Sequence, residues 1–294
     1  ASMIVTILRS EQVNPQVVGQ LGFGRWDENL PFDALEKVVR AMVDTGHRET
    51  AIGILHHRMK SKPAEVEGWK SLALELITAS PLIRSRNTMV SYSWEQVANI
   101  VGKNYPGEVV TAIFREQADR KSGTWFTEYS QAKGVIDACI KQDPSMVWQA
   151  LRPYLSSPEH AYMFTIGFPR GVLDRMPADE VGAWIAEKPE ERAAVVARLA
   201  RKNFSIDDTL ASRIIGAYGD TERVAGAFFS EYVSGVWAGP ASMHWETLAD
   251  YLEEVIGRTK LPKLRHWAAD SARSLRRMAE SDRQREEEEE LRSR

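Results

Sequence analysis

Histidine is the first residue type to test for chemistry, because general bases and metal sites use it more than any other side chain. The chain has six histidines. His56 and His57 are adjacent, so on a helix their side chains point about 100° apart and cannot share a metal in the usual i, i+4 arrangement. The others are isolated in sequence and belong to no ligand motif. We therefore expect no metal site, no catalytic histidine and no cofactor.

Other catalytic patterns are also incomplete. The single cysteine, Cys139, lies among apolar and small residues, which favours a buried structural thiol over a nucleophile. Gly19, Gly22 and Gly24 resemble a glycine-rich phosphate loop, yet no lysine followed by serine or threonine completes it. Paired carboxylates at 190–191, 207–208 and 253–254 lie where helix capping and polar faces account for them. The sequence predicts no catalytic residue and favours a chain that is not an enzyme.

Charge and hydropathy exclude two further classes. The 38 basic and 41 acidic residues give a net charge of -3, which argues against a bulk polyanion binder. Arg198, Arg201 and Lys202 form a candidate basic patch on a predicted helix over 190–202, so a nucleic-acid-binding protein, or a HEAT-like glycosylase that binds DNA lesions, remains the alternative function. No apolar run approaches the roughly 20 residues that span a bilayer, so we expect a cytoplasmic protein without membrane contact.

The elements that would position any site are helices. From residue 30 onward, apolar residues recur at helical spacing, as in Leu35, Val38, Val39 and Met42, and prolines or glycines interrupt the pattern. Strand tendency is confined to residues 3–8, which could equally form a helix or a tail. The sequence therefore predicts an all-α protein, with helices near 32–43, 47–59, 63–79, 93–101, 107–119, 127–142, 143–155, 178–187, 190–202, 208–218, 220–232, 242–258 and from 263 onward.

The predicted helices also repeat. Paired starts near Asp143, Pro177, Ser205 and Ser242 are spaced by roughly 30 to 40 residues, which is typical of helical-repeat proteins. We expect an α-solenoid of HEAT-like helical hairpins over residues 30–280, with a compact helical bundle as the alternative. Residues 1–29 form a partly irregular leader. Residues 281–294 lack an apolar face and place acids at the negative end of the helix dipole, so we expect a charged, frayed tail.

Aromatic residues near the predicted turns are the remaining candidates for a site. Trp125, Trp237 and Trp245 would either contact a protein partner or close the ends of the repeats. Gly235 and Gly239 bracket Trp237, which predicts a tight turn. We expect its indole to be mostly buried between the last two hairpins, with an exposed anchor for a partner as the alternative.

Two short segments suggest a family. Residues 235–245 (GVWAGPASMHW) and 264–268 (LRHWA), followed by the Arg- and Glu-rich end, resemble the C-terminal ends of HEAT-like helical regions in large bacterial conflict and antiphage-defence proteins. The resemblance covers residues 177–294. It implies a module that senses or docks a protein partner, as a sensor or adaptor in an antiphage-defence system, with the enzymatic part elsewhere. It supplies no active-site residue.

Overall fold

The computed structural model of the chain describes residues 1–10, 18, 21, 25–78, 88–118, 130–157, 171–204 and 207–293. Helix accounts for 83% of this part of the chain, in 14 α-helices and a few short 3-10 turns, and none of it is strand. The predicted all-α class is confirmed. The ambiguous segment near the start forms helix α1 (Ser2–Leu8), and its Leu8 is buried.

The contacts within the chain divide it into two compact units, Ala1–His160 and Ala161–Arg294. The sequence predicts a single repeat domain over 30–280 and does not predict the division after residue 160. Among the helices of the described ranges, none has the combination of length and apolar character that a membrane crossing requires.

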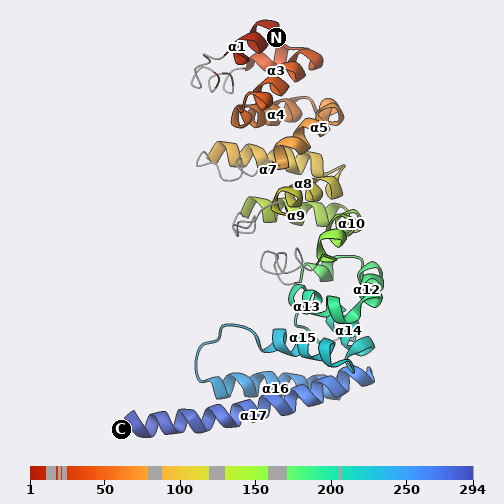
Figure 1. Ribbon diagram of the computed structural model, residues 1–294, viewed down its shortest axis with the longest axis vertical. Helices are drawn as coiled ribbons and strands as arrows, with labels where there is room; N and C mark the ends of the chain where they lie inside the picture. Colours follow the sequence, from red (N-terminus) through yellow and green to blue (C-terminus); the bar gives the residue numbers. More distant parts are fainter. Residues whose placement is uncertain are drawn as a thin grey trace. The chain divides into compact units, whose positions relative to one another are not determined.

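The first unit consists of short helices that follow one another closely (Figure 1). After α1 come the 3-10 turn η1 (Arg25–Asn29), α3 (Phe32–Asp44), α4 (Arg48–Ser61), η2 (Pro63–Glu65), α5 (Val66–Thr78), α7 (Thr88–Gly102), α8 (Pro106–Ala118), α9 (Ser130–Gln142) and α10 (Pro144–Leu155).

Helix starts and stops in this unit follow local chemistry. The stripe predicted for α3 is buried in full, with Leu35, Val38, Val39 and Met42 all at 0% exposure. Gly46 ends that helix with φ +84°, a conformation that glycine adopts without a steric penalty. Asp143 begins α10, where its carboxylate accepts a hydrogen bond from the Met146 amide at 2.9 Å.

Packing in the first unit follows a regular order. Sequential helices form the pairs α4–α5, α7–α8 and α9–α10. First members contact first members, α4 with α7 and α7 with α9, and second members contact second members, α5 with α8 and α8 with α10. Three fully buried tryptophans, Trp69, Trp94 and Trp148, belong to the core of this unit.

The second unit has a similar pattern followed by a long hairpin. Its elements are η4 (Leu173–Arg175), α12 (Ala178–Glu187), α13 (Pro189–Leu199), α14 (Leu210–Tyr218), α15 (Glu222–Val233), α16 (Ala241–Arg258) and α17 (Pro262–Ser293). Helix α12 contacts α14, α13 contacts α15, and α17 contacts both α14 and α16.

Helices α16 and α17 pair along a seam of buried residues. On α16 these are Ser242, Trp245, Ala249, Leu252 and Val255, and on α17 they include Leu264, Ala268, Leu275 and Ala279. Their spacing of three and four residues puts each set on one face of its helix. The hairpin places the α15–α16 connection and the charged end of the chain at the same end of the unit (Figure 1).

Candidate functional site

The α15–α16 connection has a defined start and end. Helix α15 ends at Val233, and the Lys202 ammonium group donates to the carbonyl oxygen of Ser234 and to that of Tyr232. At the far end, Gly239 has φ +95° and Pro240 precedes the first turn of α16. The turn therefore requires glycine at position 239, as predicted. Gly235 does not have a positive φ, so the backbone does not require glycine there.

Trp237 lies against the first turn of α16. Its ring stacks on His244, with centroids 4.3 Å apart and planes 4° apart, and meets Trp245 in an edge-to-face contact at 5.0 Å. Such arrangements are favourable for aromatic pairs and fix the orientation of the indole. These two ring contacts hold the indole against α16 and leave part of it exposed.

Trp237 is less completely buried than predicted, because 39% of it is exposed. Trp245 occupies the interior position instead, at 7% exposure, and its Nε1 donates to the Asp282 carboxylate on α17 at 2.7 Å. His244, the residue before Trp245, is partly exposed, and its ring stacks on Trp237. The connection therefore packs against the first turn of α16.

Two exposed apolar side chains flank this stack. Val236, next to Trp237, is 103% exposed, and Met243, next to His244, is 62% exposed. We call Val236, Trp237, Met243 and His244 the Trp237 surface. Large apolar groups gathered in this way on a surface mark interaction sites more often than single exposed ones do.

The end of α17 binds the first turn of α16, which carries part of the Trp237 surface. Glu286 accepts hydrogen bonds from the Ser242 hydroxyl at 2.6 Å and from the Ser242 amide at 3.2 Å. Pro240 provides no side-chain cap for α16, so a carboxylate 44 residues away satisfies its first turn. The Ser242 hydroxyl lowers the pKa of Glu286 below its ordinary value.

The structure differs from the frayed tail predicted over 281–294, since helix α17 continues to Ser293. After the apolar stripe ends at Ala279, Asp282 and Glu286 extend the seam with hydrogen bonds to Trp245 and Ser242. The pattern that could have indicated this is the continued three- and four-residue spacing of 275, 279, 282 and 286, with polar side chains in place of apolar ones.

No family model matches this chain, and neither a curated protein nor a solved structure is found to match it. The function must therefore be inferred from the geometry of the molecule itself.

The three residues of the predicted basic patch do not share one helix. Helix α13 ends at Leu199, where Ala200 turns to an extended conformation, so Arg201 and Lys202 lie beyond it. Lys202 binds the end of α15, and the Arg201 amide donates to Asp174 at 2.7 Å. Arg198, in the last turn of α13, is half-buried. The third aromatic candidate, Trp125, is outside the described residues.

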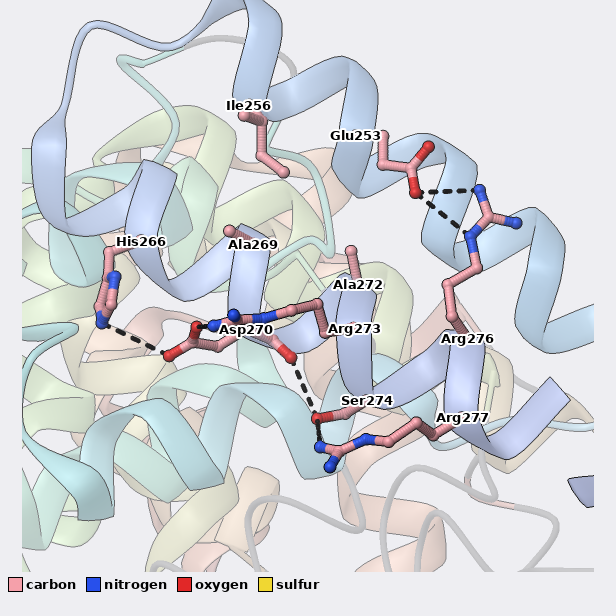
Figure 2. A pocket seen from close by; sticks show the side chains of 10 residues that line it. All are labelled: Glu253, Ile256, His266, Ala269, Asp270, Ala272, Arg273, Ser274, Arg276 and Arg277. Carbon is pink, nitrogen blue, oxygen red and sulfur yellow. Dashed lines mark hydrogen bonds and ion pairs between the residues drawn. The ribbon is translucent and has the colours of Figure 1, made fainter. Parts of the chain in front are cut away.

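A groove of about 870 Å³ runs beside α16 and α17, but its charges are largely paired (Figure 2). Arg276 binds Glu253 at 3.0 Å, and Asp270 pairs with both Arg273 and His266. Arg277 donates to the Ser274 hydroxyl at 3.3 Å. A site built for phosphate would keep more of its guanidinium groups available.

A second polar cluster, which the sequence did not reveal, lies in the first unit. Arg58 is completely buried and binds both oxygens of Glu65, at 2.6 and 2.8 Å, and the Asp27 carbonyl at 2.8 Å. His57 Nδ1 lies 2.9 Å from the buried Asp27 carboxylate. These bonds hold η1 against α4, so the cluster has a structural explanation.

Two further chemical candidates from the sequence can be placed in the structure. Cys139 is buried, and burial raises the pKa of its thiol to about 12, which suits a structural thiol. In the described part of the chain no group of three His, Cys, Asp or Glu side chains is placed to hold a metal ion.

Proposed function

We propose that this chain is a protein-binding helical-repeat module and that the Trp237 surface contacts its partner. The exposed, stacked indole of Trp237 is the observation that carries the proposal. Tryptophans held rigidly at a surface lose little side-chain entropy on binding, and they dominate the energetics of many protein interfaces. Val236 and Met243, the neighbours of Trp237 and His244 in sequence, add exposed apolar area.

The repeat architecture is part of the same proposal. In residues 1–160, like members of successive helix pairs contact one another, as in an α-solenoid of HEAT-like hairpins. The alternation of α12 with α14 and of α13 with α15 supports the same architecture in the second unit. A compact sphere of this length would have a radius of gyration of about 19 Å. A solenoid should exceed that value in small-angle scattering, and a value at or below it would favour a bundle.

The biological setting that we propose follows from the resemblance of residues 177–294 to the ends of bacterial antiphage-defence proteins. The residues that carry the resemblance, 235–245 and 264–268, include the Trp237 surface and the helix that supports it. A sensor or adaptor role would place the binding surface at this end of the module and leave catalysis to another component.

Site-specific photo-crosslinking tests the binding function. A photoreactive residue at position 236, in cells of the source organism, should form a discrete protein adduct, because Val236 is fully exposed beside the indole. The same residue at position 75, an exposed helix position in the first unit, is the control. The adduct should disappear when Trp237→Ala is added. No adduct at 236, or the same adducts at both positions, would contradict the proposal.

A further inference from the structure

We propose that the partner segment received by the Trp237 surface is cationic, with lysine or arginine beside an apolar anchor. This inference rests on the proposed function and adds the chemistry of the partner. It comes from the position of the acidic end of α17 relative to the Trp237 surface.

The register between the two helices fixes that position. Glu286 is bonded to Ser242, in the first turn of α16. Each further helical residue advances about 1.5 Å, so Glu289 and Glu290 lie roughly one turn beyond the start of α16. Figure 1 shows α17 continuing past that start, on the side where the α15–α16 connection lies. Trp245 links the two features, because its ring contacts Trp237 and its Nε1 donates to Asp282 on α17. The acidic end of α17 therefore starts beside the Trp237 surface and continues at the same end of the unit.

The local charge is strongly negative. Between Glu280 and Arg292 there are seven acidic residues and three arginines. The arginines already have partners, since Arg283 pairs with Glu246 and Glu280, Arg285 with Asp282 and Arg292 with Glu288. Within the described ranges, Glu287 and Glu289 are exposed and form no ion pair. A partner that supplies cations would satisfy these carboxylates.

The aromatic part of the surface suits the same partner. An ammonium or guanidinium group is attracted to the face of an indole, and tryptophan is the strongest aromatic partner for it. The exposed indole and the nearby carboxylates therefore both attract a basic side chain. The same carboxylates would repel nucleic acid and anionic lipid, whose charges are negative. A protein segment rich in lysine or arginine is the class of partner that fits.

Two designed peptides provide the test. They share their apolar residues and carry either lysine or glutamate at every polar position. The probe is the indole N–H signal of Trp237 in the nitrogen-15 spectrum of the full chain, identified by its loss in Trp237→Ala. We expect the lysine peptide to shift this signal and to bind at least about tenfold more tightly than the glutamate peptide, with weakening at high salt.

Neutralising the acids should remove this preference. Glu287→Gln, Glu289→Gln and Glu290→Gln together should weaken the lysine peptide at least about fivefold, while Glu286 stays in place to hold α16. The matched control neutralises three exposed acids in the first unit, Asp44→Asn, Glu67→Gln and Glu75→Gln, and should change the affinity less than about twofold.

The outcomes separate the two proposals. Binding of both peptides at Trp237 with equal affinity would overturn the cationic partner but leave a binding surface. A Trp237 signal that moves with neither peptide would contradict both. A signal that shifts with protein concentration alone would assign the surface to a second copy of the chain, which also overturns the cationic partner.

Discussion

Trp237 and Trp245 are close in sequence and in space, yet their surroundings give them different roles. Trp245 is buried in the α16–α17 seam and hydrogen-bonded to Asp282. Trp237 rests on His244 and keeps 39% of its surface exposed. Stability should therefore depend on Trp245, and binding should depend on Trp237.

Replacing each ring with alanine should separate these roles. We expect Trp245→Ala to lower the free energy of unfolding by about 3 to 5 kcal/mol, as for other buried aromatic residues. Trp237→Ala should cost less than about 1.5 kcal/mol, because 39% of its surface is exposed already in the folded chain. Urea unfolding of the two variants measures both. Equal costs would mean that Trp237 closes the last repeat, which is the role that the sequence predicted.

Arg58 is a buried and extensively hydrogen-bonded side chain of the first unit. Arg58→Met should cost about 3 kcal/mol or more, because it leaves Glu65 and the Asp27 carbonyl without their buried donor. The control is Arg40→Met, which removes an exposed pair with Glu36 and should cost about 0.5 kcal/mol. Similar values for the two variants, measured by urea unfolding, would contradict a structural role for the buried pair.

The Arg58–Glu65 pair also predicts the direction of a pH effect. The hydrogen bond from Arg58 lowers the pKa of Glu65 below its ordinary value of 4.5. The stabilisation is therefore complete above 4.5 and is lost as the pH falls through the lowered pKa. Arg58→Met should remove this part of the acid dependence of unfolding.

At the scale of the helix, the end of α17 acts as a cap for α16. Glu286→Ala should speed hydrogen exchange of the Ser242 amide relative to its intrinsic rate, because this amide loses its acceptor. In the unmodified chain the same protection should fade as the pH falls through the lowered pKa of Glu286.

The neighbouring turn provides the control for that experiment. Among the described residues, Glu288 pairs with Arg292 and is exposed on α17, so Glu288→Ala should leave the Ser242 amide as protected as before. Unchanged exchange in Glu286→Ala would show that the charged end of the helix does not rest on α16, and the predicted frayed tail would then be the better account.

The helices themselves could be predicted because their signals are local. The α3 stripe, the glycine at 46 and the Asp143 cap each act within a few residues. The order at the end of α17 could not be predicted in this way, because the partners of Asp282 and Glu286 lie 37 and 44 residues away in the sequence. Trp237 was misplaced for a similar reason, since the burial of Trp245 decides which ring occupies the interior.

At the scale of the whole molecule, the chain divides into two compact units. The sequence period predicted paired helices but not the division near residue 160, because the pattern of apolar residues does not show which pairs share a core. The features that a partner could recognise, namely the exposed rings and the acidic run, lie in the second unit.

The affinity of the protein captured at position 236 is the most direct test of the binding function. Its Kd should be measured for the unmodified chain, for Trp237→Ala and for Glu75→Ala as the surface control. We expect the Kd to rise at least about tenfold in Trp237→Ala and to stay within about twofold in the control. A Trp237→Ala chain that remains folded and binds within twofold of the unmodified chain would contradict the assignment of this surface.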